Sequence, residues 1–167
     1  VTPIVDAVGE ERNLDESLIN AINSNDIAEI KKIIEKIKKE DQFEKKINEA
    51  FFYASARAET GAVEILLNGG ADVNFKNNFG LSALMHAAGN NKTDIVKLLI
   101  KRGAAVNDVN DYGMTALMCA AGKNSPGCLD ELIKSGANIE IQASLNGINA
   151  FMIAVGANNI CLLYTSR

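Results

Sequence analysis

The chain has little of what metal and thiol chemistry require. It holds one histidine and three cysteines, and no CxxC pair occurs. Structural zinc sites need four cysteine or histidine ligands at short spacings, so we expect no metal site. An odd number of scattered cysteines does not predict a disulfide framework either. Motifs for a phosphate-binding loop, a zinc protease or a serine hydrolase are missing, and we expect no cofactor and no small-molecule substrate.

Long apolar runs and excess basic charge are also missing. No apolar stretch approaches the roughly 20 residues of a membrane-spanning helix, and the net charge is −4, so we expect neither membrane insertion nor nucleic-acid binding. Sparse cysteines favour a reducing compartment, and we expect the cytoplasm. The chain begins at Val1 rather than at methionine, which leaves a secreted or periplasmic location open. Abundant lysine, asparagine and isoleucine are typical of AT-rich genomes, and we expect a bacterial source.

Internal repetition is what the chain has in abundance. The segment GADVN begins at Gly70, GAAVN at Gly103 and GANIE at Gly136, so the interval is 33 residues both times. ALM begins at Ala83 and recurs 33 residues later, and AFM follows after another 34. Self-similarity at such a period predicts a repeat array in which each unit packs on its neighbours.

The same period sorts apolar residues into columns that extend toward the N-terminus. A position that is apolar in four or five copies is expected to pack between stacked units. The columns are Leu18, Phe51, Leu84, Leu117 and Phe151; Ala21, Ala54, Ala87, Ala120 and Ala154; Ile30, Val63, Val96 and Leu129; and Ile33, Leu66, Leu99 and Leu132. We therefore expect Leu84, Leu99 and Leu117 in the core.

Local signals within each copy predict two short helices followed by an extended hairpin. Ser82, Thr115 and Asn149 stand directly before an Ala/Leu/Met run, where a side-chain oxygen can accept from the first free amides of a helix. In the copy that contains GANIE, Ser125 and Pro126 supply a cap and a first-turn proline for the second helix. Gly70, Gly103 and Gly136 close the second helix of the later copies, and the turns NNFG, NDYG and SLNG close the hairpins.

This unit of helix, turn, helix and hairpin resembles the ankyrin repeat. That family has 33 residues per unit, a T-P-L-H-x-A signature at the first helix and G-A-D-V-N after the second. Here the signature is altered to SALM, TALM and NAFM. The resemblance implies an all-α solenoid of stacked helix-turn-helix units joined by hairpin loops. Over residues 14–159, the expected units are about 14–43, 44–76, 77–109, 110–142 and a truncated 143–159.

The two ends depart from the pattern. Residues 1–13 are expected to be a linker or a remnant of a preceding region. Ile37 stands where the first closing glycine would be, so we expect that helix to run on past Ile37. The run from Lys31 to Lys46 holds seven lysines and four acids, which favours a solvated helix face over a basic patch. Residues 160–167 are expected to be a truncated end, of which 161–167 resemble a non-native tail of a fragment.

His86 and Cys119 occupy equivalent positions in neighbouring copies and raise the question of a thiol enzyme. Stacked helices lie about 8–10 Å apart, so a thiolate–imidazolium nucleophile is conceivable. No third residue is evident to orient the imidazole, and the same column holds Asn20, Tyr53 and Ile153. We therefore predict no catalytic residues. A histidine that titrates near physiological pH and modulates binding is a further hypothesis.

The resemblance implies that a partner binds to the hairpin tips and to the inner-helix surface. The predicted partner-binding residues are Tyr53, Arg57, Asn78, Phe79, Leu81, His86, Asn90, Asp111, Tyr112, Met114, Cys119 and Lys123, with Leu145, Asn146 and Ile148 at the third tip. Phe79 and Tyr112 precede turn glycines, at a position where turns usually have a small polar residue. They are either anchors for a partner or rings folded over the neighbouring hairpin.

We therefore expect a non-catalytic protein-interaction module or scaffold that binds a protein partner on its concave face. One alternative is a regulatory or targeting module of a larger enzyme or effector. The remote alternative is a Cys–His thiol enzyme.

Overall fold

The computed structural model describes residues 15–144 and 146–156. Within these ranges the chain forms nine helices and no strands, which confirms the all-α expectation. The hairpins carry only isolated β-bridges, between Lys76 and Ser82 and between Gln142 and Asn149. The helices are α1 (Glu16–Asn23), α2 (Ile27–Ile37), α3 (Phe43–Arg57), α4 (Thr60–Asn68), α5 (Ala83–Gly89), α6 (Thr93–Lys101), α7 (Ala116–Gly122), α8 (Pro126–Lys134) and α9 (Ala150–Gly156).

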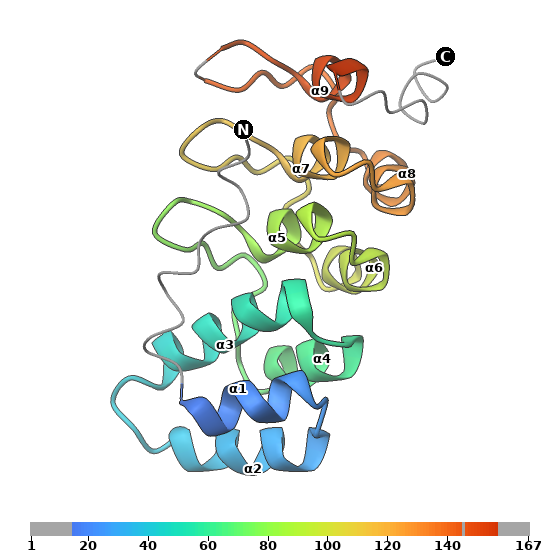
Figure 1. Cartoon of the computed structure of the whole chain (residues 1–167). Helices are drawn as coiled ribbons and strands as arrows, with labels where there is room; N and C mark the ends of the chain where they lie inside the picture. The colour runs from blue at the N-terminus through green and yellow to red at the C-terminus, as the bar shows by residue number, and fades with distance from the viewer. Residues whose placement is uncertain (1–14, 145, 157–167) are drawn as a thin grey trace.

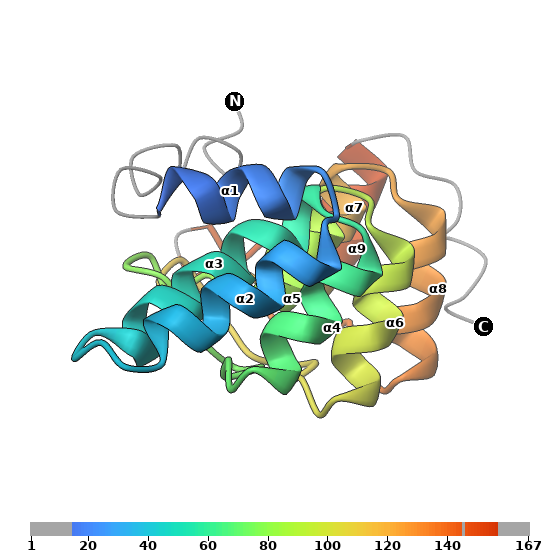
Figure 2. The ribbon, with the colours of Figure 1, turned by 90° about the horizontal axis from the view of Figure 1, so that it is seen from below.

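The helices stack in two layers, as a solenoid requires. The inner layer runs α1, α3, α5, α7, α9, and the outer layer runs α2, α4, α6, α8, with each helix in contact with the next of its layer. The hairpins project to one side of the inner layer (Figure 1). In the view from below, α6 and α8 are rotated relative to α2, so successive units turn about the stack (Figure 2).

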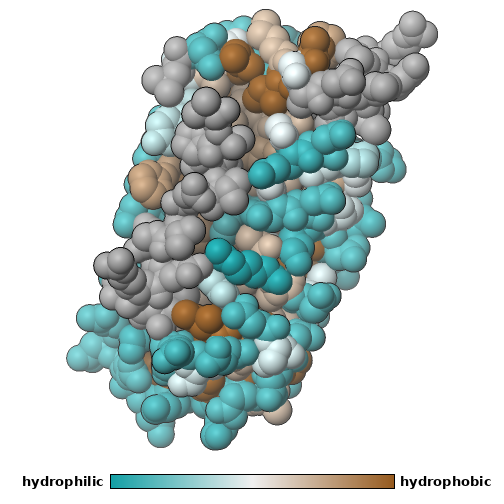
Figure 3. All heavy atoms as spheres, viewed as in Figure 1, coloured by the Kyte–Doolittle hydropathy of each residue, from teal (hydrophilic) through white to brown (hydrophobic). Residues whose placement is uncertain are grey.

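The apolar columns form the core, and their burial explains the stacking. Leu84, Leu99 and Leu117 are all fully buried, as expected. Phe151, in the same column as Leu117, is instead 38 % exposed. It lies on α9, the last helix of the described residues. Hydrophobic side chains gather on the surface at this end of the molecule (Figure 3).

The predicted caps at the inner helices are present. Ser82 Oγ accepts from the Met85 amide at 3.3 Å, and Thr115 Oγ1 accepts from the Met118 amide at 3.3 Å. Ser125 stands at the start of α8 as expected, but its side chain makes no capping bond. Its Oγ is buried and has no hydrogen-bond partner in the described part of the chain.

The first copy differs from the expectation. The prediction that α2 extends past Ile37 is wrong, because the helix ends there. The residues that follow, up to Gln42, are all polar or charged, so no apolar face remains to pack the helix onto the core. The next helix, α3, has 15 residues. Its first turns extend to the side on which later units place their hairpins (Figure 1).

Candidate protein-binding surface

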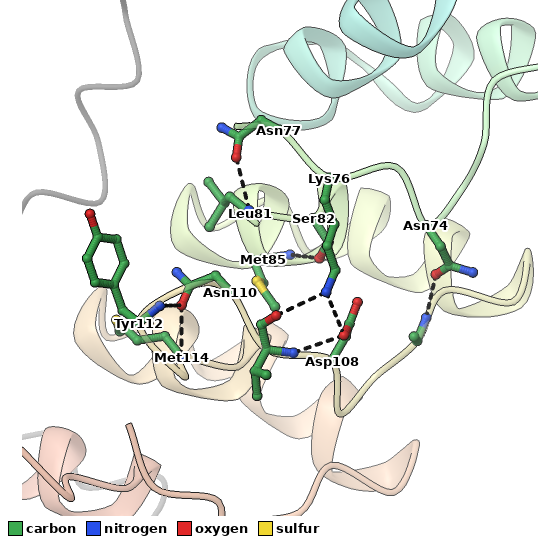
Figure 4. Close-up of polar contacts among 12 residues, drawn as sticks. Asn74, Lys76, Asn77, Leu81, Ser82, Met85, Asp108, Asn110, Tyr112 and Met114 are labelled. Carbon is green, nitrogen blue, oxygen red and sulfur yellow. Dashed lines mark hydrogen bonds and ion pairs between the residues drawn. The ribbon is translucent and has the colours of Figure 1, made fainter. Parts of the chain in front are cut away.

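An asparagine side chain holds each of the first two hairpin turns in shape. Asn77 Oδ1 accepts from the amides of Phe79 and Leu81, both at 3.0 Å. Asn110 Oδ1 accepts from Tyr112 at 3.0 Å and, in the same way, from the amide two residues further on at 2.9 Å. Figure 4 shows the bonds that join Asn77 to Leu81 and Asn110 to Tyr112 and Met114, with the Tyr112 ring pointing away from its hairpin. The asparagines thus satisfy the turn amides and leave the residue at the tip free to project.

Adjacent hairpin tips are joined through their backbones. The Asp111 amide donates to the Phe79 carbonyl at 3.2 Å, and the Ser144 amide donates to the Tyr112 carbonyl at 2.9 Å. Gly113 follows Tyr112 with φ of 73°, a conformation that favours glycine. These bonds order three successive tips into one row.

The bases of the hairpins are also linked between units, by residues that our sequence analysis missed. Asn74 Oδ1 accepts from the Ala105 amide at 2.9 Å, and Asn107 Oδ1 accepts from the Asn138 amide at 2.7 Å. The recurring final asparagine of GADVN and GAAVN was the available signal. Asn48 of α3 accepts from the Asp72 amide at 2.7 Å. Helix α3 therefore supplies the acceptor that a hairpin asparagine supplies between the later units.

A salt bridge adds a side-chain link between the first two hairpins. The Lys76 ammonium lies 2.8 Å from Asp108 Oδ1 and donates to the Val109 carbonyl at 3.0 Å (Figure 4). All three residues are partly or fully accessible to solvent. Such a pair contributes little stability, but it helps to hold the two hairpins in register.

Of the predicted tip residues, the structure exposes some and buries others. Phe79 is 48 % exposed and Tyr112 is 46 % exposed, and their neighbours Asn78 and Asp111 are exposed as well. Leu81 is only 5 % exposed. Its placement on the binding surface was wrong, because side chains along an extended hairpin arm alternate in direction and Leu81 points into the core.

The remaining tip residues are less accessible. Met114 is half-buried against the core. At the third tip, Asn146 is exposed and Ile148 is half-buried. Leu145 lies outside the described residues.

The inner-helix candidates divide in the same way. Tyr53 is buried, and its hydroxyl donates to Asn23 Oδ1 at 3.2 Å. The Arg57 guanidinium lies 4.6 Å from the centre of the Tyr53 ring and is exposed. Asn90 is exposed, and so is Lys123. Tyr53 therefore packs under the Arg57 guanidinium and exposes little surface to a partner.

His86 faces the preceding unit rather than Cys119. Its ring stacks on Phe52 at 4.4 Å between ring centres, and its Nδ1 lies 3.2 Å from the Phe52 carbonyl oxygen, to which it donates. Burial lowers the pKa of His86 to about 4, against a bond to that carbonyl that acts to raise it. The hypothesis of titration near physiological pH is thus contradicted, since removal from water disfavours the charged ring.

Cys119 is fully buried in α7, so its placement on the binding surface was wrong. Burial raises the pKa of its thiol to about 12. A reactive cysteine needs a thiolate in an accessible, electropositive setting. A neutral thiol and a neutral imidazole packed on different neighbours do not support the thiol-enzyme alternative.

The low pKa of His86 predicts a stability that falls in mild acid. Its folded-state pKa, about 4, lies below the unfolded value near 6.5. Unfolded chains therefore take up the proton first, and the stability contribution is complete above pH 6.5 and is lost as the pH falls toward 4. We expect urea unfolding at pH 5 to show a loss of about 2 kcal/mol from this residue relative to pH 7.5.

The matched control for this effect is His86→Phe. The substitution keeps a ring on Phe52 and removes the titrating group. The Phe52 carbonyl keeps a partner, because the Ser55 hydroxyl donates to it at 2.6 Å. The part of the pH dependence that arises from His86 should be absent in this variant. An identical loss of stability in both proteins would contradict the assignment to His86.

Comparisons with known proteins bear on the family. Among the residues described, no helix is long and apolar enough to cross a membrane, and no group of three or more His, Cys, Asp or Glu side chains could hold a metal ion. A search of curated proteins finds no match. The family model for ankyrin repeats (3 copies) matches residues 51–143, more than half of the chain, and the protein therefore belongs to the ankyrin-repeat family.

Proposed function

We propose that the chain binds a protein partner through its hairpin tips and the exposed residues of its inner helices, without catalysing a reaction. Ankyrin repeats are generally protein–protein interaction modules, and the family is typically non-catalytic. We call the proposed site the tip surface. It consists of Asn78, Phe79, Asp111 and Tyr112, flanked by Arg57, Asn90 and Lys123 on the inner layer.

The observation that carries the proposal is the exposure of two aromatic side chains on adjacent tips. Phe79 is 48 % and Tyr112 is 46 % exposed, although the chain has only six Phe and three Tyr. Aromatic residues are enriched among those that dominate binding energy. The backbone bond from Asp111 to Phe79 holds the two tips together before any partner arrives, which reduces the ordering cost of binding.

The alternative, that each ring folds over the neighbouring hairpin, is weakened by this exposure. In the part of the chain that is described, the ring pairs are Phe52 with Phe75 and Phe52 with His86, and neither Phe79 nor Tyr112 takes part in one. About half of the surface of each of these two residues remains available to a partner.

The test is the double variant Phe79→Ala, Tyr112→Ala. Proteins captured by the native chain from a cell extract should be captured roughly 30-fold less by the variant, because loss of hot-spot residues costs about 2 kcal/mol or more. Capture is quantified by mass spectrometry, and circular dichroism checks that both baits are folded.

The matched control is Lys97→Ala, Lys101→Ala, which changes two exposed residues of the outer helix α6. This variant should capture the same proteins as the native chain. Undiminished capture by a folded Phe79→Ala, Tyr112→Ala bait would reject the tip surface as the binding site.

A further inference from the structure

A carboxylate lies between the two exposed aromatic tips. Asp111 immediately precedes Tyr112, and its amide is bonded to the Phe79 carbonyl. Its Oδ1 lies 2.5 Å from the position that a Cβ at Gly80 would occupy. The acidic group therefore lies against the turn that carries Phe79, while its backbone leads directly into Tyr112.

The Asp111 carboxylate has no cationic partner in the described part of the chain. The nearby acid Asp108 is different, because it forms a salt bridge with Lys76 at 2.8 Å. The turns of the other two tips, residues 77–80 and 144–147, contain no acidic or basic residue. Only the middle tip thus offers a negative charge, and it offers it beside exposed aromatic surface.

This combination matches the chemistry of an arginine side chain. A guanidinium is attracted to the faces of aromatic rings, and its planar fork pairs with a carboxylate through two parallel N–H···O bonds. A lysine ammonium has the charge but neither the plane nor the fork. A nucleic-acid or other polyanionic partner would be repelled by Asp111, and a purely apolar anchor would leave the carboxylate unused.

We infer that the tip surface recognises an arginine side chain of the partner protein, with Asp111 pairing with the guanidinium and Phe79 or Tyr112 packing against its plane. This inference rests on the proposed function and specifies the chemistry of the partner. The arginine fixes where a partner segment lies along the row of tips, because its carboxylate partner occurs at the middle tip alone.

The experiment uses N-acetyl-arginine amide as the probe and N-acetyl-lysine amide as the matched cation. Each is titrated into the 15N-labelled chain, and amide chemical shifts are followed. Arginine amide is expected to shift the signals of residues 79–80 and 111–113. Lysine amide should bind about threefold or more weakly at those residues, because it lacks the bidentate geometry.

Two variants that each remove one negative charge distinguish binding at Asp111 from a general effect of net charge. Asp111→Asn should weaken arginine amide binding by about threefold to tenfold, the effect of losing one exposed charge-assisted contact. Asp130→Asn removes the same charge from α8, where Asp130 pairs with Lys134, and should leave the arginine affinity unchanged. Similar affinities for the two amides, or an arginine affinity that Asp111→Asn does not change, overturn the inference.

Failure here is distinguishable from failure of the protein-binding role. Loss of capture by Phe79→Ala, Tyr112→Ala together with no arginine preference rejects only the arginine. Full capture by that variant rejects the binding role of the tips and, with it, the recognition of a partner arginine there.

Discussion

Replacing Leu117 by alanine is expected to lower the free energy of unfolding by about 2–5 kcal/mol. Leu117 is fully buried in α7, a helix that contacts α5, α8 and α9. The cavity left by the substitution therefore opens where one unit meets both its own outer helix and its neighbours. Repeat proteins derive much of their stability from such nearest-neighbour interfaces. Urea denaturation followed by circular dichroism measures the loss.

The control within the same column is Phe151→Ala. Phe151 lies on α9 and is 38 % exposed, so its truncation removes less buried surface. We expect it to cost less than Leu117→Ala, at about 1 kcal/mol. A Leu117→Ala variant that unfolds at the same urea concentration as the native chain would contradict the stacking of α7 in the core.

Replacing Gly113 by alanine is expected to cost about 2–5 kcal/mol, the sum of a left-handed backbone penalty and a steric clash. The φ of Gly113 is 73°. A Cβ there would lie 2.5 Å from Ser144 Oγ and 2.6 Å from the Ser144 backbone nitrogen. That nitrogen donates to the Tyr112 carbonyl, so the backbone cannot move away without breaking the bond between the tips. Urea denaturation again measures the change.

Gly136→Ala separates the two contributions. Gly136 has φ of 87°, and a Cβ there would meet no atom within 4 Å. The substitution should therefore cost only about 1–2 kcal/mol from the left-handed conformation. Equal losses in the two variants would mean that the close contact between the second and third tips contributes nothing.

The sequence alone was sufficient for the architecture, for a physical reason. Helix pairs were predicted from caps such as Ser82 and Thr115, which act on amides only two or three residues away. The stacking followed from columns such as that of Leu84 and Leu117, because a side chain that recurs once per unit must meet the same neighbour in each copy. Caps and columns both recur once per unit, so they can be recognised in the sequence before the fold is known.

The exposure of Phe79 and Tyr112 could also be predicted from the sequence, because each precedes a turn glycine. The remaining candidates were chosen by their position in the repeat, which says where a backbone lies and not how deeply a side chain is covered. Leu81 and Cys119 hold binding positions in the repeat pattern but are buried here. Position alone therefore overestimated the surface.

The tertiary structure alone decided the interactions that join one unit to the next. His86 packs on Phe52, and Asn48 of a helix takes the role that Asn74 and Asn107 have in hairpins. Asp111 comes to lie beside the turn of the preceding hairpin. Each of these contacts joins residues 24 or more positions apart, whose approach depends on how neighbouring units are oriented. The sequence by itself determined the repeating frame, and the packing of each unit on the next decided which side chains that frame presents to a partner.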